Sequence, residues 1–152
     1  MRIVVCVKHV PDMQSERRFE GGRLVRGEDD VLNELDENAI EAAVQMKEAE
    51  EDAGREAEVI ALTMGPEDAE DALMRALQMG ADRAFLVSDE FLEGSDVITT
   101  ASVLSVAIAK VSEECGPVDL VVTGMASLDA MTSMLPGALA AKAHMPLLGL
   151  AR

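Results

Sequence analysis

The sequence predicts an α/β fold in which a parallel, twisted sheet is flanked by helices. Short apolar runs of strand length alternate along the chain with longer amphipathic stretches typical of helices. The runs are rich in β-branched residues and lack polar alternation, as expected for strands buried on both faces. Parallel strands need right-handed crossovers, and ligands on such sheets bind at the carboxyl ends of the strands.

The first strand is predicted at Arg2–Val7, whose centre reads IVVCV. Pro11 is expected to break the extended chain after it, because proline has no N–H for a β-ladder. The following polar segment, residues 13–30, contains glycines and is predicted to be a long excursion from the core. A short edge hairpin is expected within it, at Gly22–Arg26.

The clearest helix is predicted at residues 33–53, where apolar residues follow the i, i+3/i+4 spacing. Asn33 or Asp36 is expected to be its N-cap. Residues 58–63 (EVIALT) form the second predicted strand. A turn at Met64–Pro66 then leads into a second amphipathic helix over residues 67–79, with proline suited to the first helical turn.

The remaining elements repeat this alternation. A third strand is predicted at residues 83–87, a third helix at 95–114 after an acidic loop, and a fourth strand at 118–122. A fourth helix is expected within residues 131–143, with Pro136 near its start, where a missing N–H is best tolerated.

Length and composition limit what the chain does. Its 152 residues, about half of them apolar, suffice for a buried core, and we expect one domain spanning residues 1–152. The 29 acidic against 13 basic residues give a formal net charge of −16, which disfavours nucleic acid and anionic membranes as partners. Cys6 and Cys115 are expected to be reduced thiols, which fits a cytoplasmic protein. No apolar run is long enough for membrane insertion or a signal peptide.

Several motifs of catalysis and cofactor binding are missing from the sequence. Neither G-x-G-x-x-G nor G-x-x-x-x-G-K-[ST] occurs. His9 and His144 are isolated from any cysteine or histidine at metal-ligand spacing. Asp129 follows a strand end, a good catalytic position, but has no evident nucleophile or base beside it. We therefore predict no catalytic and no metal-binding residue.

Three segments at predicted strand ends are candidates for ligand binding. In residues 122–137, a strand opens into a Gly-containing turn with Ser and Thr before a helix, which is typical of a phosphate site but also of a helix-capping loop. Asn33–Asp36 has residue types that read a ribose or base edge, although helix capping explains them more simply. Met64–Pro66 allows close backbone approach, but a plain βα turn is the simpler interpretation.

Four stretches of the chain carry a resemblance to a known family. They are IVVCVKHVPD at residues 3–12, VLNELDENAIEAAVQMKEA at 31–49, LTMGPEDAEDALMRALQMGADRAFLVSD at 62–89 and VDLVVTGMASLD at 118–129. The MGADRA segment at residues 79–84 is especially specific. With these segments, the chain resembles the β subunit of electron transfer flavoprotein over essentially its whole length.

The resemblance implies a Rossmann-like fold of the adenine-nucleotide α-hydrolase type. It also implies a heterodimer with an electron transfer flavoprotein α subunit that holds FAD. Most β subunits of the family hold AMP as a structural nucleotide, and some hold a second FAD in its place. The heterodimer carries electrons from acyl-CoA dehydrogenases or other flavin dehydrogenases to an acceptor, so the subunit is a carrier rather than an enzyme.

The resemblance also implies which residues contact the nucleotide. They lie after the first strand, at the start of the first helix, after the second strand and in the loop after the fourth strand. These residues are Cys6, Val7, Lys8, Asn33, Glu34, Leu35, Asp36, Met64, Gly65, Gly124, Met125, Ala126, Ser127, Leu128, Asp129, Ala130, Met131, Thr132, Ser133 and Met134.

Two departures from the family pattern affect these expectations. The family's loop has glycine after the aspartate, where this chain has Ala130, and Met131 and Met134 replace residues that are polar or glycine. A positive φ at Ala130 would be costly, so weaker AMP binding is expected. Family members also continue into a recognition loop and a C-terminal arm, and an end at Arg152 suggests a fragment. The alternative function is a stand-alone adenine-nucleotide binding or sensing module. An adenylate-forming ligase is least favoured.

Overall fold

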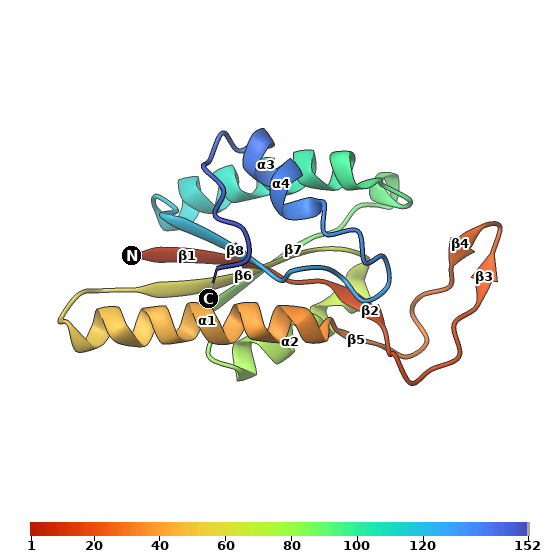
Figure 1. The fold of residues 1–152 in the computed structure, drawn as a ribbon, viewed down its shortest axis with the longest axis horizontal. Helices are drawn as coiled ribbons and strands as arrows, with labels where there is room; N and C mark the ends of the chain where they lie inside the picture. Colours follow the sequence, from red (N-terminus) through yellow and green to blue (C-terminus); the bar gives the residue numbers. More distant parts are fainter. Residues whose placement is uncertain (152) are drawn as a thin grey trace.

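The computed structural model of the chain describes residues 1–151 and confirms the α/β architecture (Figure 1). Strands and helices alternate along most of the chain, as predicted. The strands are β1 (Arg2–Cys6), β2 (His9–Pro11), β3 (Phe19–Glu20), β4 (Arg23–Leu24), β5 (Asp30–Leu32), β6 (Glu58–Met64), β7 (Arg83–Val87) and β8 (Leu120–Thr123). The helices are α1 (Glu34–Asp52), α2 (Glu70–Gln78), α3 (Val97–Cys115) and α4 (Leu135–Lys142), with short 3₁₀ turns η1 (Glu67–Ala69) and η2 (Glu90–Leu92).

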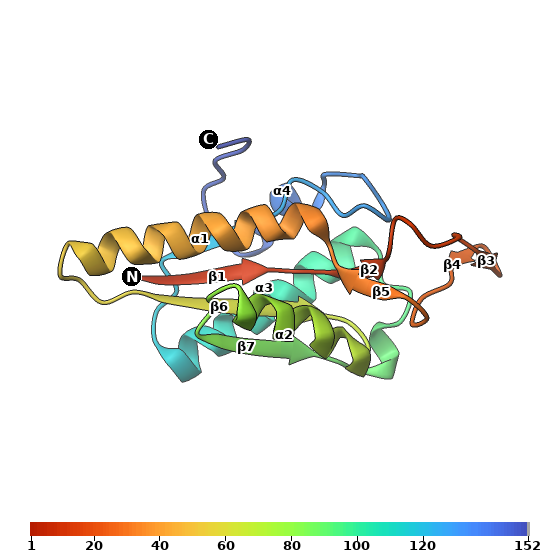
Figure 2. The ribbon, with the colours of Figure 1, turned by 90° about the horizontal axis from the view of Figure 1, so that it is seen from below.

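The main sheet has four parallel strands in the order β7-β6-β1-β8. Its register places Val4 of β1 between Ile60 of β6 and Val121 of β8. Helices α1 and α2 cover one face of the sheet, and α3 and α4 cover the other (Figure 2). The carboxyl ends of all four strands therefore point to one edge, where a ligand site is expected.

The core is divided by the sheet into two apolar clusters. Side chains of β1 alternate between them, with Ile3 and Val5 packed beneath α1 and α2 and with Val4 and Cys6 packed beneath α3 and α4. Both central strands are buried on both faces, which explains why their sequences are apolar without alternation.

The segment after β1 differs from the prediction. β1 ends at Cys6, before the segment around Pro11 that is predicted to break it, but residues His9–Pro11 form β2, which pairs antiparallel with β5 in a separate two-stranded sheet. Proline is tolerated there because the short strand lies at an edge and needs no further ladder N–H. The hairpin in the excursion exists, but Gly22 lies in its turn with a φ of 79°, and the strands are β3 and β4 on either side.

Other boundaries shift by a few residues. The predicted helix at residues 67–79 is divided into η1 and α2. Helix α3 begins at Val97, because the carboxylate of Asp96 accepts a hydrogen bond from the Thr99 N–H at 2.7 Å and caps the helix. Helix α4 has Pro136 at its second position, as the prediction of a proline near its start requires.

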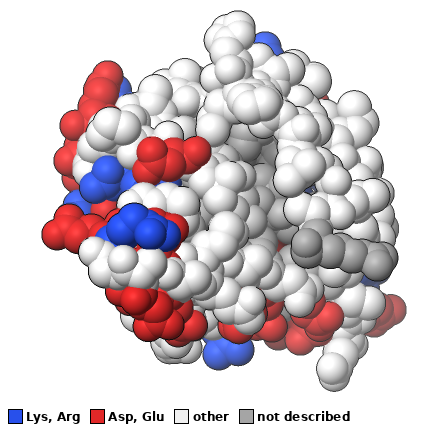
Figure 3. All heavy atoms as spheres, turned by 60° about the vertical axis from the view of Figure 1, so that its left-hand side comes forward, with Lys and Arg blue, Asp and Glu red and all other residues white. Residues whose placement is uncertain are grey.

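Charged residues are unevenly spread over the surface. On the face in Figure 3, Asp and Glu gather to one side with a few Lys and Arg among them, and a broad area carries neither. In residues 1–151, none of the helices combines the length and apolarity needed to cross a membrane.

Candidate functional site

Three segments distant in sequence meet at the carboxyl edge of the sheet. They are the end of β1 with Lys8, the start of α1 with Asn33 and Asp36, and the loop after β8. We call the segment Gly124–Met134 the nucleotide loop, after the contacts that the sequence predicts for it.

Asn33 connects the start of α1 to the nucleotide loop. Its side chain is fully buried; Nδ2 donates to the Ala126 carbonyl at 3.0 Å, and Oδ1 accepts from the Leu128 N–H at 3.0 Å. Asn33 occupies the N-cap position of α1, but its side chain makes no capping hydrogen bond. The capping interpretation is thus wrong for this side chain, because both of its polar atoms serve the loop instead.

Asp36 lies in the first turn of α1 and is also buried. Its Oδ2 accepts the Lys8 N–H at 2.9 Å, so it is not an N-cap either. A side chain at Gly124 would overlap Oδ1 of Asp36 and would lie 2.9 Å from the Leu35 carbonyl oxygen, so only glycine fits. Burial raises the pKa of Asp36 to about 6, and hydrogen bonds from Asn33 and from the Lys8 backbone oppose that rise.

Asp129 is the second buried carboxylate of the site, with a side chain only 2% exposed. Its oxygens accept from Lys8 Nζ at 2.9 and 3.0 Å, and it forms a further ion pair with Arg26. Burial by itself would raise the pKa of Asp129, but hydrogen bonds from Lys8, Ser127 and Arg26 hold it well below its usual range. Asp129 is therefore a permanently ionised group that fixes the loop rather than an acid or base.

The second half of the nucleotide loop has an unusual backbone. Met131 and Ser133 both have a φ of 51°, in the left-handed region. Ala130 is not among the residues with positive φ, so the expected strain falls on its neighbours instead. Thr132 and Ser133 are exposed, and Met134, the N-cap residue of α4, makes no side-chain capping hydrogen bond. Free backbone N–H groups beside hydroxyls are an arrangement suited to an anion such as phosphate.

Comparison with known proteins identifies the family of the chain. The profile of the electron transfer flavoprotein domain matches residues 22–151. The chain belongs to the electron transfer flavoprotein family.

Its relatives include β subunits of electron transfer flavoproteins and similar proteins. The chain is 39% identical over 140 residues to protein FixA of Azorhizobium caulinodans, covering 90% of this chain and 48% of the relative. It is 38% identical over 147 residues to the electron transfer flavoprotein subunit beta of Mycobacterium bovis, covering 95% and 54%. It is 39% identical over 148 residues to the caffeyl-CoA reductase-Etf complex subunit CarD of Acetobacterium woodii, covering 96% and 53%. The chain spans about half the length of these relatives.

The other residues that the resemblance implies as nucleotide contacts include four at the ends of β1 and β6. Cys6 and Val7 are buried in the two core clusters, so only their backbone faces the edge. Burial raises the pKa of the Cys6 thiol to about 12, which makes it unreactive. Met64 ends β6 at the same edge and Gly65 follows it, and no hydrogen bond among residues 1–151 joins either residue to the nucleotide loop.

Some of the predicted nucleotide contacts have apolar or acidic side chains, and these differ in exposure. Glu34 is exposed and Leu35 is half-buried. Three methionines of the nucleotide loop, Met125, Met131 and Met134, are each more than half exposed. They are therefore available to a ligand or partner rather than used for packing.

Two arginines of the site carry no signal in the sequence. Arg26 pairs with Asp129, and Nη2 of Arg17 donates to the Leu128 carbonyl at 3.2 Å. Both lie in the polar excursion, and its length and composition are the only features of the sequence that indicate a role for it. Contacts across more than a hundred residues, 103 and 111 positions here, have no local pattern from which to infer them.

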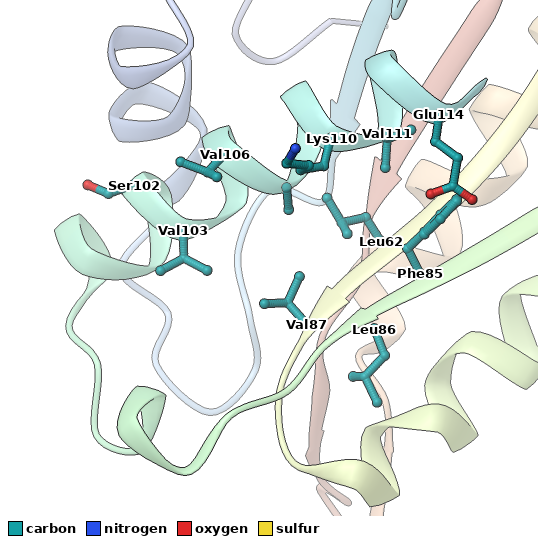
Figure 4. A pocket seen from close by; sticks show the side chains of 11 residues that line it. Leu62, Phe85, Leu86, Val87, Ser102, Val103, Val106, Lys110, Val111 and Glu114 are labelled. Atoms are coloured by element: carbon teal, nitrogen blue, oxygen red, sulfur yellow. The ribbon is translucent and has the colours of Figure 1, made fainter. Parts of the chain in front are cut away.

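An apolar groove lies on another part of the chain. A groove of about 550 Å³ runs between α3 and the edge strand β7, lined mainly by Phe85, Val87, Val103, Val106 and their neighbours (Figure 4). None of the residues predicted to contact the nucleotide lines it. The nucleotide residues instead lie on an open edge, where a ligand would be held by loop contacts rather than by enclosure.

Proposed function

We propose that this chain is the nucleotide-binding domain of a β-type electron transfer flavoprotein subunit, and that it is a carrier rather than an enzyme. It would hold AMP at the carboxyl edge of the sheet and pair with an α subunit that holds FAD. The heterodimer would take electrons from flavin dehydrogenases. The family match and the names of the relatives support the electron-transfer part of this proposal.

The observation that carries the nucleotide part is the convergence of three segments on one loop. Asn33 holds its first half by two hydrogen bonds, Asp36 lies against Gly124 at its start, and Lys8 holds Asp129. The structural support surrounds the loop on the side away from solvent, which leaves its hydroxyls and the first turn of α4 open. Such pre-organised support is what a binding loop needs, because ordering on binding would cost affinity.

The donor set fits a phosphate group. Thr132 and Ser133 supply hydroxyls, and the uncapped N–H groups at the start of α4 supply backbone donors. FAD, when bound by the heterodimer, would supply the redox chemistry. The residues of this chain would bind and orient the adenine nucleotide, and none of them needs to move a proton.

We also expect the protein to act in the cytoplasm as one domain over residues 1–152. Cys6 and Cys115 are both free thiols, in keeping with a reducing compartment. The heterodimer partner is expected to meet the apolar residues exposed on this edge, which include Met125, Met131 and Met134.

Nucleotide released from denatured protein tests this proposal. Purified protein is unfolded in acid, and the supernatant is analysed by mass spectrometry, with AMP expected. The sequence has no Trp or Tyr, so adenine absorbance of the native protein is readily seen. A flavin in the supernatant would mean that the site holds FAD in place of AMP. Failure to retain or to bind any adenine nucleotide, measured by calorimetry with added AMP, would refute the nucleotide part.

A further inference from the structure

The excursion between β2 and β5 is tied to the nucleotide loop. We call residues 12–29 the strap. Arg26 forms an ion pair with Asp129, and its Nη1 donates to the His9 carbonyl at 3.3 Å. Arg17 adds a hydrogen bond to the Leu128 carbonyl. The strap projects past the carboxyl edge of the sheet, with β3 and β4 at its end (Figure 1). Arg26 and Arg17 join it to the loop.

Arg26 is more than a surface ion pair because its partner is buried. The Asp129 side chain is 2% exposed, whereas Arg26 is 36% and Lys8 is 41% exposed. A buried carboxylate that loses one of its cations remains partly uncompensated, which costs more than the loss of an exposed pair. The guanidinium fork also reaches the carboxylate and the His9 carbonyl together, which a lysine ammonium does not do in the same geometry.

Asp129 lies between the two halves of the nucleotide loop. Before it, residues up to Leu128 are held by Asn33. After it, the backbone turns through Met131 and Ser133 in left-handed conformations, which ordinary residues adopt only when other contacts impose them. The position of Asp129 therefore determines where the exposed hydroxyls of the second half lie.

We propose that Arg26 is a positioning residue of the nucleotide site. It fixes Asp129 from the strap side, and through Asp129 it orients the half of the loop that receives the phosphate. This inference rests on the proposed function, since it concerns the phosphate of the same adenine nucleotide. Recognition of the phosphate depends on Arg26, and recognition of the adenosine part, which the loop's second half does not hold, is independent of it.

Binding of two ligands to matched variants tests the proposal. Calorimetry compares AMP and adenosine on the wild type, Arg26→Ala and Arg26→Lys. Arg26→Ala is expected to weaken AMP about tenfold, the size of one charge-assisted hydrogen bond, and to change adenosine less than about twofold. Arg26→Lys is expected to restore AMP binding in part. In an Asp129→Asn background, Arg26→Ala is expected to change AMP affinity less than about twofold, because the path through Asp129 is already broken.

The control is Arg18→Ala. Arg18 lies in the same strap but pairs with Glu28 inside it, and among residues 1–151 no hydrogen bond or ion pair joins its side chain to the loop. Equal AMP affinities for the Arg26→Ala and Arg18→Ala variants would overturn the proposal, and so would an equal loss of AMP and adenosine, which would mean a general structural defect.

Amide hydrogen exchange separates this inference from the proposed function. Without any ligand, Arg26→Ala is expected to speed exchange at least about threefold in residues 12–29 and 124–134, with strands β1 and β6 unchanged. Unchanged exchange in the loop would overturn the positioning role even if AMP binds. A wild type that binds neither AMP nor adenosine would refute the proposed function and with it the phosphate part, whereas the exchange result would still decide the link from strap to loop.

Discussion

The contact between Gly124 and Asp36 gives the sharpest test of how the site is built. A β-carbon at Gly124 would overlap the Asp36 carboxylate and would lie 2.9 Å from the Leu35 carbonyl oxygen and 3.1 Å from its carbon. The backbone of α1 cannot retreat easily, since Asp36 N donates to the Asn33 carbonyl at 2.8 Å and Asn33 is itself fixed. In Gly124→Ala, therefore, either the loop or the start of α1 has to move.

The expected cost follows from two parts. Overpacking in a close-packed region costs about 1–3 kcal/mol. Displacing Asp36 weakens its hydrogen bond with the Lys8 N–H, and hydrogen bonds to charged groups contribute about 1.5–3 kcal/mol. We expect Gly124→Ala to lower the free energy of unfolding by about 3–5 kcal/mol, and the midpoint of thermal unfolding by roughly 10 °C for a domain of this size.

Gly137→Ala is the matched control. Gly137 lies inside α4, and a β-carbon there would meet nothing within 4 Å. This variant should be unchanged or more stable by about 0.5–1 kcal/mol, because alanine favours a helix interior. Circular dichroism in a urea series measures both variants, since the chain has no Trp or Tyr for fluorescence. Equal unfolding midpoints for the two variants would refute the reasoning. In an Asp36→Ala background, the cost of Gly124→Ala should shrink, because the overlap with the carboxylate is gone.

Four further predictions concern the same edge. Folding raises the pKa of Asp36 from 3.8 to about 6. The contribution of protonated Asp36 to the free energy of unfolding is therefore full below pH 4 and is lost as the pH rises through 6. Between pH 4 and 7, the free energy of unfolding of the wild type should therefore fall by about 2 kcal/mol more than that of Asp36→Asn, as measured by urea series at each pH. Asn33→Ala leaves two loop backbone groups unpaired and should cost about 2–4 kcal/mol in the same assay, with faster amide exchange at the loop. In a Cys115→Ala variant, Cys6 should react with a disulfide reagent only upon unfolding, and labelling of native protein within minutes would contradict its burial. Ser133→Gly should stabilise the protein by about 1 kcal/mol, since glycine adopts a φ of 51° without cost, and an unchanged urea midpoint would argue against strain there.

The main sheet could be predicted from the sequence because its signals are local. Arg2–Val7 and residues 58–63 are continuous β-branched runs, and burial on both faces is the physical cause of that pattern. The sequence did not predict strand β2, which contains Pro11, because proline is excluded only from the interior of a sheet. At the end of a short edge pair, its missing N–H has no consequence.

The side chains of the site were harder to assign, because one residue type serves two purposes. Asn33 and Asp36 are as suitable for capping α1 as for contacts elsewhere. Sequence gives no preference when the competing partners lie 93 and 95 positions from Asn33 and 28 positions from Asp36. The structure assigns the Asn33 side chain to the loop. Capping of α1 is then left to its acidic first turn, where Glu34 and Glu37 favour the helix dipole.

In the nucleotide loop, the position of a residue substitution does not predict the position of the backbone strain. An alanine after the aspartate predicts strain at Ala130, yet the backbone relaxes there and takes its left-handed conformations at Met131 and Ser133. Two such residues cost of the order of 1–2 kcal/mol each, so the loop does not adopt this path by its own preference. Contacts from Asn33 and Asp129 must impose it. The residues that hold the loop and the residues that would bind a phosphate are therefore coupled, and affinity for a nucleotide should depend on side chains that never touch it.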